Sequence, residues 1–186
     1  MADYLTRSDY KIVYPADYQE IVQQKIAEGQ AAFGWADFNI PSGSEVYFQL
    51  KTNGTLTHIF GREVTTDSEE LAYSLYENPS VTDGTTEVSL VNINRNLADN
   101  NIPITVYSDP TNIDLTSATQ IELDEIFTAD KKSASTQGLK GADRVLAPNT
   151  DYIFEFSNPT NSTCRVFAKF FFYFWDVRHP PRIFER

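Results

Sequence analysis

The sequence predicts a mainly β protein, an antiparallel β-sandwich or jelly roll with a short N-terminal helix and extended terminal arms. After Pro41, apolar side chains recur at every second position in several short segments, and turn-forming residues separate these segments. No alternation of strands with helical segments is present, which excludes a doubly wound nucleotide-binding fold. We expect an arm and helix over residues 1–44, the sandwich over 45–176 and an extended tail over 177–186.

The predicted helix covers residues 15–28. Pro15 suits a first helical turn, and Gly29 suits the position after a helix end. Between them a single stripe recurs at three- and four-residue spacing, formed by Tyr18, Ile21, Val22, Lys25 and Ile26. A short helix with one stripe is not stable alone. It must therefore lie either on the core of its own domain or against another subunit.

The predicted strands share one core. Asn53-Gly54 predicts a hairpin turn, and alternation in the surrounding segments places one set of side chains inside the sandwich. That set is Phe48, Leu75, Val106, Phe154, Phe156, Phe170 and Phe172. His58 has the parity of its apolar neighbours, which predicts a half-buried histidine. Residues 128–142 have little apolar content and are predicted to form a long loop.

The last predicted strand, residues 165–175, is apolar on both faces. The face opposite the core carries Phe167, Phe171, Tyr173 and Trp175, interrupted only by Lys169. Such a strand lies at the centre of a packed structure, or one of its faces is covered by another chain. A third interpretation is a stacking platform for sugars or single-stranded bases.

Composition argues against several kinds of function. The chain has 15 basic and 26 acidic residues, so its net charge of 15 − 26 = −11 disfavours nucleic-acid binding. One cysteine and two histidines offer few ligands for a metal site or members of a catalytic relay. The segment 121–126 alternates acidic with apolar residues, which predicts carboxylates that face solvent. We therefore expect no catalytic residues, no metal and no cofactor.

The N-terminus and the apolar runs bear on location. Met1 begins a polar stretch, which does not resemble a signal peptide. The longest apolar run, residues 170–175, is too short to span a bilayer. We expect a protein that is neither exported nor inserted into a membrane.

Several turn and strand motifs, taken in order, resemble those of small structural proteins of tailed bacteriophages. They lie in residues 75–85, 92–96, 105–111 and 146–152 and in the aromatic strand ending at 176. The motifs read as an E-x-P turn, an N-x-N-R-N stretch, a V-[YF]-x-x-P turn and an L-x-P-N-T-x-Y corner. The resemblance covers roughly residues 45–176, and residues 25–38 resemble the N-terminal segment of that group more loosely.

That group is similar to capsid decoration, or cement, proteins. The resemblance implies a non-enzymatic virion protein, made in the host cytoplasm, that stabilises the capsid's outer surface by bridging major capsid protein subunits. Capsid sites lie on symmetry axes, so it also implies a homo-oligomer, either dimer or trimer. The alternative is a carbohydrate- or receptor-binding module of a virion fibre, which would use exposed Tyr and Trp side chains.

The terminal segments are the predicted attachment regions. Each has too few apolar residues to fold by itself, and such a segment becomes ordered only on another surface. The interface candidates are Tyr4, Leu5, Ile12, Val13, Ile21, Trp175, Arg178, Arg182, Ile183 and Phe184.

Overall fold

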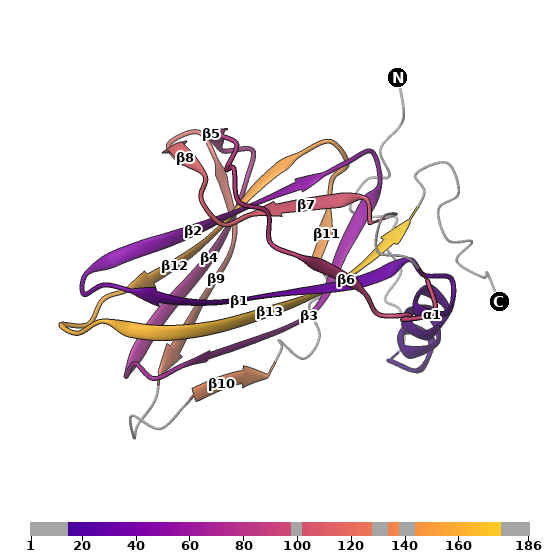
Figure 1. The fold of residues 1–186 in the computed structure, drawn as a ribbon, viewed down its shortest axis with the longest axis horizontal. Coiled ribbons are helices and arrows are strands. Elements are labelled where there is room, and N and C mark those ends of the chain that lie inside the picture. Colours follow the sequence, from indigo (N-terminus) through magenta and orange to yellow (C-terminus); the bar gives the residue numbers. More distant parts are fainter. Residues whose placement is uncertain (1–14, 98–101, 128–133, 138–143, 176–186) are drawn as a thin grey trace.

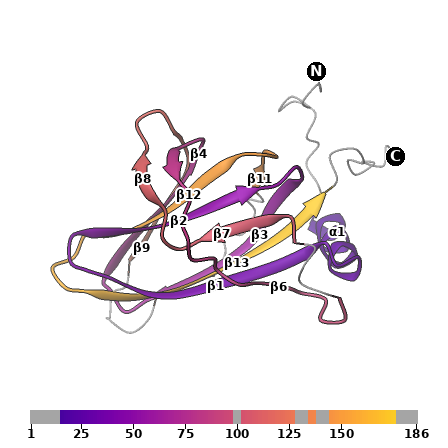
Figure 2. The ribbon, with the colours of Figure 1, turned by 45° about the horizontal axis from the view of Figure 1, so that its top comes forward.

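The computed structural model describes residues 15–97, 102–127, 134–137 and 144–175, which form two antiparallel sheets and one helix (Figures 1 and 2). The six-stranded sheet is called sheet A, and the five-stranded one is called sheet B. The two sheets pack face to face, and the helix lies at one end. This architecture confirms the predicted sandwich with a short N-terminal helix.

Sheet A places the first and the last strand of the described chain side by side. Its strand order is β10 (Ala134–Gln137), β3 (Leu56–Thr66), β13 (Cys164–Trp175), β1 (Ala31–Ile40) and β6 (Leu90–Asn92), and β11 (Arg144–Leu146) also pairs with β3.

Sheet B has the strand order β7 (Ile104–Tyr107), β2 (Ser44–Thr52), β12 (Asp151–Asn158), β4 (Glu70–Glu77) and β9 (Thr119–Phe127). Two further strands, β5 (Ser80–Thr82) and β8 (Thr111–Asp114), pair with each other outside both sheets. Figure 1 shows this small hairpin-like pair at the upper left, beyond sheet B.

Strand β1 belongs to the sandwich, although the sequence predicted an arm and helix over residues 1–44. It pairs with β13 along its whole length without a register shift. On its inner face Gly34 stands between two alanines, so the apolar alternation that marks a strand is weak there. The sandwich therefore begins at Ala31 rather than at residue 45. Strand β10 similarly lies within the predicted loop over residues 128–142.

The predicted core lies between the sheets and is confirmed. Six of its seven members are buried in one cluster, and Phe170 packs against that cluster. The six buried residues are Phe48, Leu75, Val106, Phe154, Phe156 and Phe172. The ring centres of Phe154 and Phe170 are 4.6 Å apart, across the gap between sheet B and sheet A. Cys164, the first residue of β13, is buried in the same cluster.

Two hydrogen bonds of Tyr152 hold the chain in place at the start of β12. The Tyr152 hydroxyl donates to the Glu77 carboxylate at 2.8 Å and accepts the Ala147 N–H at 2.8 Å. Burial of this side chain is the main cause that raises the pKa of Tyr152, and its hydrogen bond to Glu77 is the second. These bonds explain the L-x-P-N-T-x-Y corner, because the tyrosine holds the leucine-to-proline segment against sheet B.

Helix α1 (Pro15–Ala27) packs on the outer face of sheet A and forms a second, smaller core there. Val22 is buried against Ala31 and Tyr173, and Ile26 packs on the same group. Gly29 follows the helix with a φ of 72°, which favours glycine. The helix predicted over residues 15–28 is confirmed, and Val22, Lys25 and Ile26 of its stripe lie on the protein's own sheet.

A β-bulge reverses the predicted orientation of part of β9. The register between β4 and β9 shifts between Leu75 and Tyr76. As a result the Glu122 side chain is only 2% exposed, whereas Leu123 is 58% exposed. The prediction that the carboxylates of this segment face solvent is therefore wrong for Glu122.

Candidate functional site

The outer face of sheet A carries a line of aromatic side chains, which we call the aromatic strip. Because side chains of a strand alternate between its faces, the residues between the buried core positions all point outward. The strip consists of Phe33 and Trp35 from β1, Phe60 from β3, and Phe167, Phe171, Tyr173 and Trp175 from β13.

The rings of the strip contact one another along its length. Phe33 stacks on Trp35 with ring centres 5.6 Å apart and lies 6.1 Å from Phe171, its register partner on β13. Phe60 continues the contacts, 5.8 Å from Phe171 and 5.6 Å from Tyr173. Tyr173 in turn contacts Trp175 at 6.2 Å, so six rings of the strip are connected, and Phe167 follows on the same face of β13 beyond Lys169.

A β-bulge in β3 makes room for this packing. The register with β13 shifts between Phe171 and Phe172, so Phe60 is the extra residue in β3. The next residue is Gly61, where an added Cβ would lie 3.3 Å from the Phe171 ring. The absence of a side chain at Gly61 therefore leaves room for the Phe171 ring beside the backbone of β3.

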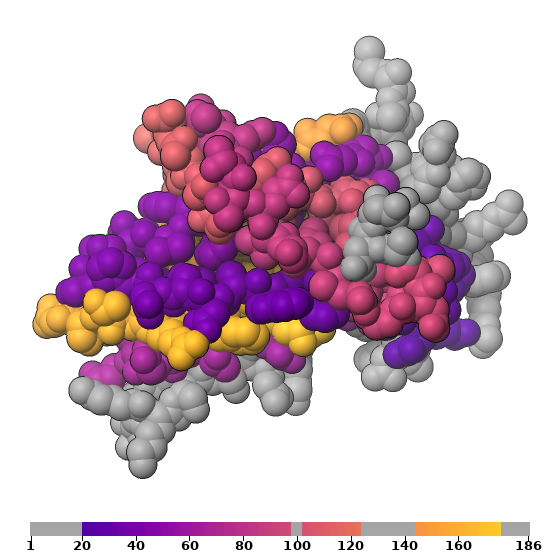
Figure 3. Space-filling model, in the orientation of Figure 1, coloured from indigo at the N-terminus to yellow at the C-terminus, as the bar shows by residue number. Residues whose placement is uncertain are grey.

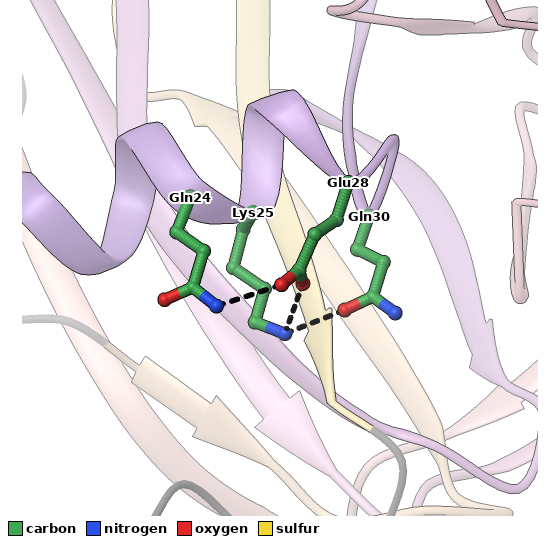
Figure 4. A network of polar contacts seen from close by, with 4 residues as sticks. All are labelled: Gln24, Lys25, Glu28 and Gln30. Carbon is green, nitrogen blue, oxygen red and sulfur yellow. Dashed lines mark hydrogen bonds and ion pairs between the residues drawn. The ribbon is translucent and has the colours of Figure 1, made fainter.

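Helix α1 covers only one end of the strip. The Lys25 Nζ lies 4.0 Å from the Trp175 ring centre and contacts Glu28 at 2.8 Å and Gln30 at 2.6 Å (Figure 4). Figure 4 also shows Gln24 donating to the same Glu28 carboxylate. The bond from Lys25 holds the pKa of Glu28 below its usual range. Trp175 is therefore half-buried beneath the helix.

The other end of the strip is uncovered in the described part of the chain. Trp35 is 44% exposed and Phe167 is 38% exposed, and Phe33 and Phe171 are half-buried. We call these four residues the open part of the strip. Monomeric proteins seldom leave a contiguous aromatic surface uncovered, and such surfaces mark contact sites.

Charged groups surround the open part of the strip in nearly balanced numbers. The Lys169 Nζ lies 4.5 Å from the Phe171 ring centre and 4.9 Å from that of Phe33, and Lys169 lies opposite Glu63 in the register of β13 with β3. Arg165 donates to both carboxylate oxygens of Asp37, at 2.8 and 2.5 Å. This hydrogen bond lowers the pKa of Asp37. The surface is thus apolar at its centre and close to neutral at its border.

The acidic groups on sheet B have a structural explanation. Asp83 accepts from Gln49 at 2.8 Å and from Lys51 at 2.5 Å, and Asp151 accepts from Gln49 at 3.2 Å. The hydrogen bond from Lys51 is the main cause that lowers the pKa of Asp83, and the hydrogen bond from Gln49 is the second. These contacts fasten the segment after β5 to the outer face of sheet B. Among the described residues no group of three or more His, Cys, Asp or Glu side chains is placed to hold a metal ion.

Buried charged side chains connect β3 of sheet A with β9 of sheet B. Arg62 of β3 forms an ion pair with Glu122 of β9 and donates to the Tyr73 hydroxyl at 3.4 Å. The Arg144 Nε lies 3.6 Å from the same carboxylate. These groups close the gap between sheet A and sheet B, and Arg62 is only 5% exposed, so the cluster is structural.

Of the predicted interface residues, two lie in the described part of the chain. Ile21 is half-buried on α1, and Trp175 is the end of the aromatic strip beneath that helix. The others lie outside the described residues: Tyr4, Leu5, Ile12, Val13, Arg178, Arg182, Ile183 and Phe184. His58 is half-buried, as predicted, and stacks on Tyr173 with ring centres 4.4 Å apart.

Sequence reasoning found the β13 half of the strip and missed the β1 half. Phe33 and Trp35 alternate with small residues, and that alternation was the available signal. Pairing of β1 with β13 places them beside Phe171 and Lys169, which no local pattern indicates.

The described segments contain no helix with the length and hydropathy needed to cross a membrane. Comparisons of the chain with protein-family models, curated proteins and solved structures give no match, so a function must be argued from the surface itself.

Proposed function

We propose that this protein is a non-enzymatic structural component of a phage virion, which binds the outer surface of the capsid and stabilises it by bridging major capsid protein subunits. The open part of the aromatic strip is the observation that carries the proposal, because it is a built contact surface on a rigid sheet. The order of turn motifs over residues 45–176 supplies the class of partner, through its resemblance to capsid decoration proteins.

The chemistry of the strip favours a protein partner over a sugar. A sugar ring needs a flat aromatic face that is free to receive it. Here one face of Trp35 stacks on Phe33, and Lys169 lies over the rings of Phe33 and Phe171. Phenylalanine-rich surfaces with a border of paired charges are typical of contacts between proteins.

The position of the strip suits attachment by more than one region of the chain. Helix α1 and the end of β13 lie together at one end of the sandwich in both ribbon views (Figures 1 and 2). The chain continues from Pro15 toward its N-terminus and from Trp175 toward its C-terminus. The two described elements from which these segments continue, α1 and β13, therefore meet at the covered end of the strip.

The test is co-sedimentation with particles assembled without this protein. A double variant, Trp35→Ser with Phe167→Ser, removes the two most exposed rings of the strip and is expected to bind at least tenfold more weakly, about 1.4 kcal/mol. Leu123→Ser is the matched control, because Leu123 is exposed on sheet B outside the strip. The control is expected to bind like the original chain.

The proposal is overturned if the double variant and the control bind particles equally well. It is also overturned if the original chain does not bind particles and instead binds a glycan through Trp35, which would make it a carbohydrate-binding module of a virion fibre.

A further inference from the structure

One edge of sheet A is unpaired over half the length of a strand. Strand β6 pairs with β1 only at residues 32–34, and β1 continues to Ile40. From Trp35 onward, no strand of the described chain lies along this side of β1. In Figure 3 the indigo β1 and the purple β2 form the bare surface on the left, and magenta segments cover their continuation on the right.

The backbone groups at this edge point outward at alternate residues. The Ala31 carbonyl accepts the Ile93 N–H at 3.0 Å on this side, and in an antiparallel ladder every second residue points its N–H and C=O the same way. Asp37 and Asn39, which lie beyond the end of the ladder with β6, therefore present their N–H and C=O groups at the free edge. No strand of the described chain pairs with β1 at these two residues.

Two other edge strands are protected against pairing with another chain, and this part of β1 is not. Strand β9 has a β-bulge and the inward-pointing Glu122, two features that discourage edge-to-edge pairing. Strand β7 is covered, because the Val88 N–H donates to the Val106 carbonyl at 2.8 Å. Over residues 37–40, β1 has no bulge in its pairing with β13 and no described strand on its other side.

Charge at this edge permits contact between copies. The chain has a net charge of −11, so two copies repel unless they meet at a neutral surface. At the β1 edge, Trp35 and Asn39 are uncharged. Asp37 is bound by Arg165 through two hydrogen bonds, which makes the pair neutral.

A small apolar cavity of about 30 Å³ lies behind the same edge. It is bounded on the β1 side by Gly34, Trp35 and Ala36, of which the two inward-facing residues, Gly34 and Ala36, are small. Val88 and Leu90 complete its wall next to the edge. A chain placed along β1 would cover this part of the core as well.

We propose that residues 37–39 of β1 pair antiparallel with the same residues of a second copy of this chain. Under twofold symmetry Asp37 lies opposite the partner's Asn39, and Asn39 opposite the partner's Asp37. The two A sheets become one continuous sheet, and the open parts of the two aromatic strips lie on the same face. This pairing depends only on the β1 edge, whatever the strips bind.

The experiment compares the molar masses of the full chain and two variants in solution, measured by light scattering after size exclusion. Asp37→Pro removes the outward N–H of one of the two paired residues, and a proline at this position removes no hydrogen bond to β13. Asp37→Ala is its matched control, because it removes the same carboxylate and keeps the N–H. The original chain and Asp37→Ala are expected to be dimers, and Asp37→Pro a monomer with the same circular dichroism spectrum.

A second measurement covers the case in which Asp37→Pro does not fold. Amide hydrogen exchange of the original chain should show protection of Asp37 and Asn39 that increases with protein concentration. A monomeric original chain overturns the proposal, and so does a folded Asp37→Pro variant that dimerises like Asp37→Ala. Exchange at these two amides that is independent of concentration also overturns it, and none of these outcomes depends on capsid binding.

Discussion

The ammonium group of Lys25 lies over the ring of Trp175, and this contact joins the only described helix to the last strand of sheet A. Lys25 is 6% exposed, and its remaining partners are the side chains of Glu28 and Gln30. A buried cation with an aromatic face and two oxygen partners fixes the position of α1 more narrowly than apolar contact does.

Replacing Lys25 by Met should loosen the helix. The variant keeps most of the apolar stem and removes the charge, so we expect a loss of about 1–2 kcal/mol in the free energy of unfolding, measured in urea. Gln24→Met, exposed on the same helix, is the control and should change stability by less than about 0.5 kcal/mol. Equal losses in the two variants would contradict the role given to Lys25.

The two faces of β13 should respond differently to truncation. Phe172 is 1% exposed in the core, so Phe172→Ala should cost about 3–5 kcal/mol. Phe167, five residues earlier and 38% exposed, should cost less than about 1 kcal/mol when replaced by Ala. Thermal or urea unfolding of both variants measures the difference, and similar costs would contradict the assignment of faces.

The ion pair between the sheets should tolerate removal of both partners better than removal of one. Glu122→Leu leaves the buried Arg62 without its carboxylate, and we expect a cost of about 3–5 kcal/mol. Adding Arg62→Met to that variant should recover most of the loss, because no buried charge remains. Glu63→Gln, on the exposed face of β3, is the control. A double variant less stable than Glu122→Leu alone would show that the charges themselves stabilise the fold.

Asp109 should contribute to the loss of stability in acid. Its carboxylate accepts the backbone N–H and the hydroxyl of Thr86, and the same two groups of Thr85. The backbone bond from Thr86 is the main reason that the pKa of Asp109 is lowered. A carboxyl group with a lower pKa in the folded state stabilises the fold above its unfolded pKa, which is about 4. This contribution is lost as the pH falls through the folded value.

The variant Asp109→Asn tests this pH dependence. It should melt at a lower temperature than the original chain at neutral pH, and the difference should shrink as the pH is lowered below about 4. Glu45→Gln, exposed on β2, should leave the difference between neutral and acid melting temperatures unchanged. A constant difference for Asp109→Asn at all pH values would contradict the prediction.

Deleting residues 1–14, or separately 178–186, should leave the sandwich folded and weaken attachment. Ordering a segment costs about 1–2 kcal/mol per residue, so each arm needs a preformed surface on its partner. Circular dichroism reports the fold, and co-sedimentation with undecorated particles reports binding. If both truncated chains bind like the full chain, the open part of the strip alone carries attachment.

The fold was predictable where side chains alternate strongly, and less so where backbone geometry decides. The helix and the core positions on β12 and β13 followed from spacing alone. Strand β1 was not recognised, because Gly34 and its alanine neighbours carry almost no apolar signal on the inner face. Glu122 was assigned to the wrong face, because a bulge in β9 changes the parity of the strand without any mark in the sequence.

The candidate site was predictable only in part, because two distant segments build it. The sequence indicated that β13 is apolar on both faces, and it left open what covers the outer one. Helix α1 covers Tyr173, and nothing in the described chain covers Phe167. That difference depends on where the helix lies on the sheet, which is a property of tertiary packing.

Because Cys164 is buried, the rate at which a thiol reagent labels it can be used to measure unfolding kinetics. It is the single cysteine of the sequence, and it is 2% exposed at the start of β13. Burial raises the pKa of its thiol, and thiol reagents attack the thiolate, so the folded protein should be labelled very slowly. Each molecule that takes up one label must first have separated β13 from its neighbours. The labelling rate therefore reports opening of the sandwich without an engineered reporter.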